Sequence, residues 1–256
     1  MLEQYGGWPT LLSELCDGEN LTSEKTELVL SEILSGEADP SQISAFLIAL
    51  KVKGETTEEI IGLVRGMLNA SEPLSLPENS IDIVGTGGSL QRREAALNVS
   101  TMASFVAAAS GAVVCKHGNR RASSTSGAFD LLDALGLPVD QTPLEVAEQV
   151  NSKNLGFAFA KTFHPAMRFA GPVRAGIGVP TVFNILGPLS HPGRIKRHLI
   201  GTVNSELAKQ MAEVLLENGS KHAWIVTGET GIDEISVTGT TNIVELKDGK
   251  ISEWTL

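Results

Sequence analysis

The residue pattern changes at residue 81, and this change limits most strongly the folds that the chain can adopt. From residue 81 onward, short β-like runs such as 81–84 and 113–115 alternate with longer helical runs. Strands that alternate with helices are typical of a mainly parallel sheet. Before residue 81 only helical patterns occur. We therefore predict an α/β fold class, in which a small N-terminal helical domain precedes a larger α/β domain with a mainly parallel central sheet.

The helical part has clear capping signals. Asp39 can cap a helix, and Gln42 stands three residues later; Thr56 and Glu59 repeat this spacing. A stretch rich in Pro and Ser then indicates a linker. The predicted domains are 1–72 (helical), 73–80 (linker) and 81–256 (α/β).

Composition excludes several classes of protein. The chain has a net charge of −10, which argues against general nucleic-acid binding, because affinity for phosphate backbones depends on positive charge. Residues 82–200 are the exception, since they hold 12 Lys and Arg against 7 Asp and Glu. This local excess indicates an anionic ligand or a chance distribution of surface charge. With no membrane-spanning apolar run and no signal peptide, we expect a cytoplasmic protein.

A glycine-rich turn follows the first predicted strand. The sequence Gly85-Thr86-Gly87-Gly88 precedes a helix that begins near Asn98, Ser100 and Thr101. Glycines allow backbone N–H groups to approach a phosphate, and a helix N-terminus favours negative charge. A structural turn followed by a capped helix explains the same residues about as well.

Three further stretches carry polar groups suited to an anion or a cation. Residues 116–127 combine Lys116 and Arg120 with glycines and hydroxyl residues, which favours an oxyanion site. Asp233 and Glu234 follow a predicted strand; they indicate either a Mg²⁺ site or a solvated acidic loop. Arg174 stands among small and apolar residues, so we expect it to have an anionic partner, either a protein carboxylate or a ligand.

These stretches together resemble the anthranilate phosphoribosyltransferase family. The motifs GTGG, NVST, KHGNR, HPAM, FNILGPL and IDE occur in the order of that family, and the resemblance covers essentially the whole chain. It implies transfer of the phosphoribosyl group of phosphoribosyl pyrophosphate (PRPP) to the amine of anthranilate, with release of pyrophosphate, in tryptophan synthesis. It also implies Mg²⁺ as cofactor and a helical domain beside an α/β domain.

The resemblance also implies roles for residues, none of them as a general acid or base. The predicted contacts to PRPP are Gly85, Thr86, Gly87, Gly88, Asn98, Ser100, Thr101, Lys116, Ser123 and Ser124. The predicted contacts to the aromatic acceptor, an amine-bearing acid, are Asn119, His164, Arg174 and Pro188. The predicted Mg²⁺ ligands are Ser100, Asp233 and Glu234.

The chain departs from the family pattern near the PRPP loops. Ser89 replaces an aspartate, Arg92 and Arg93 arrive with about three inserted residues, and further changes occur at Ala96, Thr125 and Ala128. We expect the two arginines to contact pyrophosphate and partly replace lost metal contacts, or else to form an exposed basic loop with no role in binding. Family members also continue beyond residue 256, so we expect the C-terminal part to be missing.

These departures leave alternatives open. One is a phosphoribosyltransferase for another aromatic acceptor, and another is a non-catalytic relative that binds a ligand or nucleic acid. A nucleoside phosphorylase is disfavoured because its Lys-His-Ser-Thr-Gly-Gly signature is absent. Because the apolar faces of helices over 43–50 and 60–68 are large, we also predict a homodimer through residues 1–70.

Overall fold

The structure is a computed structural model of the 256-residue chain, and it describes residues 1–87, 97–120 and 126–256. The chain forms two compact units. A helical unit contains Met1–Ser71 and His164–Ser190, and an α/β unit contains Glu72–Phe163 and His191–Leu256. Among the described residues, no helix combines the length and the apolar character needed to cross a membrane.

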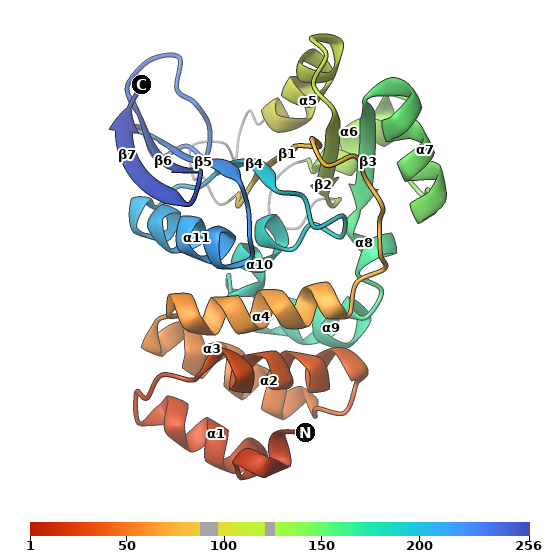
Figure 1. The fold of residues 1–256 in the computed structure, drawn as a ribbon. Coiled ribbons are helices and arrows are strands. Elements are labelled where there is room, and N and C mark those ends of the chain that lie inside the picture. The colour runs from red at the N-terminus through yellow and green to blue at the C-terminus, as the bar shows by residue number, and fades with distance from the viewer. Residues whose placement is uncertain (88–96, 121–125) are drawn as a thin grey trace. The chain divides into compact units, whose positions relative to one another are not determined.

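The helical unit begins at the predicted capping signals. The Asp39 backbone N–H donates to Gln42 Oε1 (2.8 Å), and Thr56 and Glu59 exchange two such bonds. Reciprocal bonds of this kind satisfy backbone N–H groups at a helix start. The helices of this unit are η1 (Leu2–Tyr5), α1 (Gly7–Cys16), α2 (Ser23–Ser35), α3 (Pro40–Lys53), α4 (Thr57–Asn69), α9 (Met167–Ile177) and α10 (Phe183–Leu189) (Figure 1).

The apolar faces of α3 and α4 are buried within this unit. The buried residues are Ile43, Phe46, Leu47 and Leu50 of α3 and Ile60, Leu63, Val64 and Met67 of α4. Of the large apolar residues on these two helices, Ile48 and Val52 are exposed. The apolar surface from which the homodimer was predicted is therefore mostly used in the core of the unit itself.

The α/β unit contains the predicted mainly parallel sheet. The strands are β1 (Asp82–Gly85), β2 (Val114–Gly118), β3 (Leu155–Phe159), β4 (Arg197–Gly201), β5 (His222–Gly228), β6 (Thr241–Lys247) and β7 (Lys250–Thr255). The order β1-β4-β5-β6-β7 is parallel from β1 to β5 and antiparallel after it, and β2 and β3 form a parallel pair. A parallel bridge between Ile81 and Val114 links the two groups of strands.

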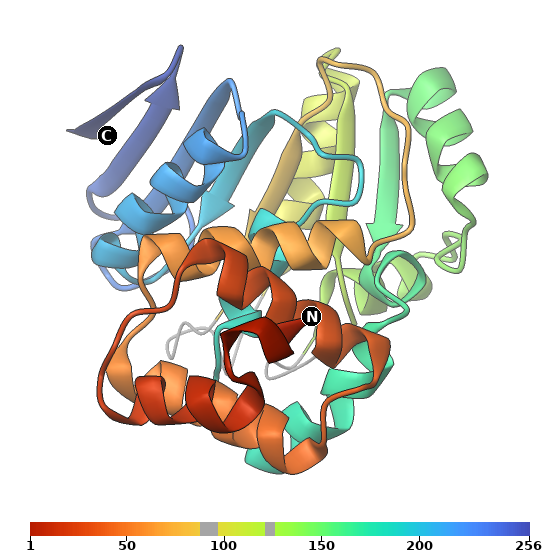
Figure 2. The same ribbon diagram turned by 60° about the horizontal axis from the view of Figure 1, so that its bottom comes forward.

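Helices cover the strands of this unit. They are α5 (Val99–Ala109), α6 (Ala128–Ala134), α7 (Pro143–Lys153), α8 (Ala160–Phe163) and α11 (Ser205–Glu217). Helix α11 packs against β5 and β6, and Figure 2 shows it lying along these strands. It buries Met211, Val214 and Leu215 on that side.

The apolar residues of α5 are not all on its buried face. Met102, Val106 and Ala109 are exposed. Thr101 and Ser104 are buried instead. The Ser104 hydroxyl donates to the Ser100 carbonyl (2.8 Å), so this buried polar group has a hydrogen-bond partner within its own helix.

The two units do not follow the predicted boundaries along the chain. Residues 164–190 group with the helical unit, because α9 packs against α2 and α3 and α10 packs against α4. The segment 73–80, predicted as a linker, groups with the α/β unit. Its Leu74 is buried in a cluster with Cys115 and Phe163. These contacts join segments that are distant in sequence, so pattern alone does not reveal them.

Candidate functional site

The predicted glycine turn begins at the carboxyl end of β1. Thr86 donates its backbone N–H to the carbonyl of Gly201, at the end of β4 (2.8 Å). Gly87 has a φ of 71°, a conformation that favours glycine, and its N–H donates to Asp233 Oδ2 (3.0 Å). The glycine turn is therefore held both by the neighbouring strand and by a predicted metal ligand.

The predicted acidic pair lies in the loop that follows β5. Gly228 donates its N–H to the carbonyl of Ile232 (2.9 Å), which closes a short turn just before the pair. Asp233 is buried and Glu234 is half-buried. The carboxyl ends of parallel strands meet at one edge of a sheet. The structure thus brings the acidic loop of β5 to the glycine turn of β1, across 146 residues of sequence.

Two glycines make this approach possible. A Cβ at Gly85 would lie 2.6 Å from Asp233 Oδ2, and a Cβ at Gly201 would lie 1.7 Å from the Asp233 carbonyl oxygen. Either contact is too short for a real side chain. Sequence reasoning missed Gly201, although a glycine directly after the apolar end of a strand often marks a close backbone approach.

The start of α5 carries three of the predicted PRPP contacts. Asn98 occupies the N-cap position without a side-chain cap bond; its Nδ2 donates to Ser126 Oγ (3.0 Å) instead. Ser100 is half-buried and Thr101 is fully buried. In the part of the chain that the structure describes, Thr101 Oγ1 has no hydrogen-bond partner. The first backbone N–H groups of α5 are therefore not capped by the Asn98 side chain, as an anion site requires.

Lys116 of β2 is buried beside Asp82 of β1. Its Nζ donates to the carbonyl of Ile83 (2.6 Å), and the His117 N–H donates to Asp82 Oδ1 (3.0 Å). Burial raises the pKa of Asp82 to about 7, against the opposing effect of Lys116. Burial likewise lowers the pKa of Lys116 to about 8, against the effect of Asp82. The ammonium of this predicted PRPP contact is thus directed to the β1 backbone. Sequence reasoning missed Asp82, whose signal is a carboxylate inside an apolar strand.

Asn119 follows β2 and is exposed. Its Oδ1 accepts the backbone N–H of Arg120 (2.8 Å). The Arg120 side chain forms an ion pair with Asp133. Several other predicted positions lie outside the described residues; they are Gly88, Ser89, Arg92, Arg93, Ala96, Ser123, Ser124 and Thr125.

The other predicted acceptor contacts belong to the helical unit. His164 is buried, and this burial lowers its pKa to about 4, so its ring is neutral at pH 7. Pro188 is buried within α10. The guanidinium of Arg174 lies over the ring of Phe183, 4.9 Å from its centre, and burial lowers its pKa. No carboxylate among the described residues forms an ion pair with Arg174, so the expected protein partner is not found there.

The donor set at the carboxyl edge suits Mg²⁺. Magnesium prefers oxygen ligands and takes one or two carboxylates from the protein, with waters or phosphate oxygens completing its shell. Asp233 and Glu234 supply two adjacent carboxylates, and Asp233 is held in place by Gly87. The described residues contain no cluster of three or more His, Cys, Asp and Glu that would indicate a different metal.

Comparisons with known proteins agree with this geometry. Residues 77–256 match the Glycosyl transferase family, a/b domain, and residues 9–71 match its helical bundle domain. The anthranilate phosphoribosyltransferase of Rhodopseudomonas palustris is 44% identical over 96% of this chain and 72% of its own length.

Two solved structures of enzymes with that name are also similar. The enzyme of Thermus thermophilus is 41% identical with a TM-score of 0.87, over 96% of this chain and 72% of its own. The enzyme of Saccharomyces cerevisiae, solved in complex with PRPP and Mg, is 31% identical with a TM-score of 0.86, over 97% and 72%. The predicted family, fold class and enzyme class are thereby confirmed. The chain belongs to the anthranilate phosphoribosyltransferase family of glycosyltransferases.

Proposed function

We propose that the carboxyl edge of the α/β sheet binds PRPP together with Mg²⁺, and that the chain transfers the phosphoribosyl group to the amine of anthranilate, with release of pyrophosphate, as a step of tryptophan synthesis. One observation carries this proposal. The Asp233 carboxylate accepts the Gly87 N–H, so an acidic pair and a phosphate-type glycine turn occupy the same edge of the sheet. An acidic loop without a metal would repel the phosphates that such a turn attracts.

The glycine turn and the start of α5 would bind the phosphates of PRPP. Gly85, Thr86 and Gly87 lie at the end of β1, where the N–H groups of Thr86 and Gly87 already donate to Gly201 and Asp233, and the first turn of α5, which the Asn98 side chain does not cap, follows. Backbone N–H groups at such a helix start stabilise negative charge that grows on a leaving group. Lys116 remains a predicted PRPP contact. A rotation of its ammonium away from the Ile83 carbonyl would be needed for direct contact.

Asp233 and Glu234, with the Ser100 hydroxyl, would hold the metal. When bound, Mg²⁺ would neutralise charge on the phosphates and stabilise the departing pyrophosphate. Asp233 is preorganised for this task by its buried position and by the Gly87 hydrogen bond. Gly201 supports the same arrangement, since only glycine leaves room for the Asp233 backbone.

Arg174 would bind the carboxylate of the acceptor. A guanidinium that is partly desolvated and forms no ion pair with a carboxylate of the described residues favours an anionic ligand, because burying an unpaired charge is costly. Arginine also pairs with carboxylates in a bidentate fork, which orients a planar acid. His164 and Pro188 are predicted to line the acceptor's path, and the neutral ring of His164 would add no competing charge. Asn119 is the remaining predicted acceptor contact.

The proposal is tested by turnover and by binding. Product formation from PRPP and anthranilate is measured across a Mg²⁺ titration, together with PRPP binding by calorimetry. We expect the double variant Asp233→Asn with Glu234→Gln to lose Mg²⁺-dependent PRPP binding and to lower kcat/KM at least about 1,000-fold, because the metal contributes several kcal/mol.

The matched control is Asp140→Asn, which removes a carboxylate at an exposed position of the α/β unit. It should behave as the parent does. Unchanged PRPP binding in the double variant would overturn the metal assignment. If the parent protein acts on another aminobenzoate but not on anthranilate, that aminobenzoate becomes the proposed acceptor, and the PRPP and Mg²⁺ parts of the proposal stand.

Assembly and compartment are further parts of the proposal. A homodimer through residues 1–70 is supported by the exposed apolar residues Ile48 and Val52 of α3, the latter 82% exposed. Light scattering on the parent and on Val52→Glu tests this contact, and a monomeric parent at high micromolar concentration would contradict it. The cytoplasm is the proposed compartment, consistent with two free cysteines, one of them exposed.

A further inference from the structure

The amino edge of the same sheet carries a row of basic residues. The strand register aligns Arg197 of β4 with His222 of β5, and His222 with Lys247 of β6. Lys247 in turn is paired with Lys250 of β7. Residues in register on neighbouring strands project from the same face of a sheet. Four basic side chains therefore stand side by side, at the edge opposite the glycine turn.

This row lies on the face of the sheet that α11 does not cover. Helix α11 packs against β5 and β6, where Ala223, Ile225, Val244 and Leu246 are buried. The row belongs to the other face of these strands, where Arg197 and His222 are half-buried and Lys247 and Lys250 are exposed. The basic side chains are thus available to a ligand.

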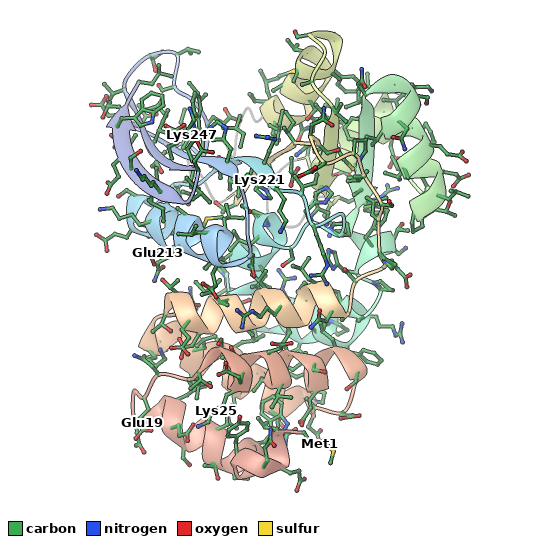
Figure 3. All side chains as sticks on the ribbon, in the orientation of Figure 1. Met1, Glu19, Lys25, Glu213, Lys221 and Lys247 are labelled. Carbon is green, nitrogen blue, oxygen red and sulfur yellow. The ribbon has the colours of Figure 1, made fainter. Side chains whose placement is uncertain are left out.

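A pocket of about 260 Å³ opens at this row. Its lining residues are Arg197, Ser220, Lys221, His222, Lys247, Asp248 and Gly249, all within the α/β unit. Figure 3 labels two of them, Lys221 and Lys247, at this unit. The volume is close to the lower end of small-molecule sites, about 300 Å³. Three Lys and Arg side chains and one histidine surround this space, with Asp248 as the one carboxylate in the lining.

Two of the cations at this pocket are not held in ion pairs by the residues that the structure describes. Lys221 pairs with Glu78, and His222 Nε2 lies 3.0 Å from Glu245 Oε1. Within the described ranges, neither Arg197 nor Lys247 forms an ion pair. Like charges that face each other across strands destabilise a sheet. A ligand with negative charge would remove that cost.

A neighbouring lysine gives independent support. The Lys196 ammonium donates to the carbonyl of Asn218 (2.7 Å). Its pKa is lowered by partial burial and then by Arg194 and Lys221. Part of the basic excess found in residues 82–200 is therefore concentrated beside this pocket and not at the carboxyl edge of the sheet.

We propose that the pocket lined by Arg197, Lys221, His222 and Lys247 is a second anion site, which binds the phosphate group of a small phosphorylated molecule or free phosphate. Arginine presents a planar fork of N–H donors that matches phosphate oxygens, and lysine adds a compact charge. Arg197 and Lys247, which form no ion pair within the described ranges, favour a ligand with two negative charges, so a phosphate group fits better than a single carboxylate. A pocket whose lining has more cations than carboxylates also concentrates anions from solution.

The test is calorimetry with inorganic phosphate and, separately, with ATP, on the whole chain. The pocket variant is Arg197→Gln with Lys247→Gln. The control is Lys51→Gln with Lys209→Gln, which removes the same charge from exposed positions outside the pocket lining. We expect phosphate affinity to fall at least about tenfold in the pocket variant and to stay unchanged in the control, because charge-assisted hydrogen bonds are lost only in the former.

The two probes separate the sources of the phosphate group. ATP that binds more tightly than phosphate, with the gain lost in the pocket variant, would identify a nucleotide; equal affinities would identify free phosphate. The single variant Arg197→Lys keeps the positive charge but loses the planar fork of N–H donors. Its affinity for phosphate should lie between those of the parent and the double variant.

Thermal melting of the parent, the control and Arg197→Lys gives a second readout, which does not require the double variant to fold. Phosphate should raise the melting temperature of the parent, the control and, to a smaller extent, Arg197→Lys. Equal loss of phosphate binding in the pocket variant and the control would mean that only general charge attracts the anion, and it would overturn the site. Unchanged binding in the pocket variant would overturn it as well.

Discussion

The two edges of one sheet present different polar groups to the anions that we propose they bind. At the carboxyl edge, the polar groups are backbone N–H groups and two carboxylates, held by glycines at 85, 87 and 201. At the amino edge, the polar groups are the side chains of Arg197, His222 and Lys247, aligned by strand register. In our proposals, the first edge holds phosphate together with Mg²⁺, and the second holds it with basic side chains of its own.

This difference has a consequence for tolerance to mutation. A backbone site depends on close packing, so a single added methyl group can displace it by an ångström or more. A side-chain site depends on charge, so its affinity for the anion should fall in steps as cations are removed. Substitutions at the two edges and in the helical unit test this contrast.

The largest effect is expected for Gly201→Ala. The added Cβ would lie 1.7 Å from the Asp233 carbonyl oxygen, so the acidic loop must move away from the end of β4. A displacement of about 1 Å in a catalytic arrangement costs about 100-fold in rate. We expect kcat/KM for PRPP to fall by that amount. The measurement is steady-state kinetics at saturating Mg²⁺, with melting temperature recorded in parallel.

The matched control is Gly171→Ala in α9, where a Cβ would meet no atom within 4 Å. Helix interiors favour alanine over glycine, so this variant should be at least as stable as the parent. Full activity in Gly201→Ala would mean that the acidic loop has no role in the reaction.

The carboxyl edge was largely predictable from the sequence because its parts are local motifs. The Gly85–Gly87 turn and the Asp233-Glu234 pair each follow a strand that could be recognised from its apolar run. Their convergence follows from the parallel order of the strands. The sequence did not reveal the residues that pack against these motifs. Gly201 makes room for the Asp233 backbone, and Asp82 lies beside Lys116.

The amino edge could not be predicted in the same way. Arg197, His222 and Lys247 are separated by about 25 residues each, and no motif links them. Register places them in one row, and register depends on tertiary pairing. The grouping of residues 164–190 with the helical unit escaped prediction for the same reason, because it rests on packing of α9 and α10 against distant helices.

The next effect concerns Arg174 in the helical unit, which we propose binds the acceptor carboxylate. Arg174→Ala should raise the KM for anthranilate about 10- to 100-fold, as expected for the loss of hydrogen bonds to a charged group. The KM for PRPP should change little. Arg174→Lys should recover only part of the loss, because lysine cannot form the bidentate fork.

The control for this prediction is Arg168→Ala in the same helix. Arg168 also lies over an aromatic ring, that of Phe169 at 4.5 Å, but is not a predicted acceptor contact. An equal rise of both KM values in Arg174→Ala would make Arg174 a phosphate-binding or structural residue.

The smallest effect is a pH dependence of stability that arises at the amino edge. His198 of β4 is buried, with Nε2 2.9 Å from the Ile195 carbonyl oxygen and 3.3 Å from Ser220 Oγ. Burial, with a contribution from Lys196, lowers its pKa to about 4. In the unfolded chain its pKa is about 6.5. Between these values the unfolded state binds a proton that the folded state does not, so the free energy of unfolding falls as pH falls.

We expect each such histidine to cost up to about 1 kcal/mol per pH unit between pH 6.5 and 5, a window above most carboxylate titrations. His164, with its pKa also near 4, contributes the same trend in the helical unit. Denaturant unfolding of the parent, His198→Asn and His164→Asn across this pH window separates the contribution of His198 from that of His164. Asparagine can still donate to the Ile195 carbonyl, so His198→Asn should fold and show a shallower slope. A His198→Asn slope equal to that of the parent would mean that His198 does not contribute to the acid sensitivity of folding.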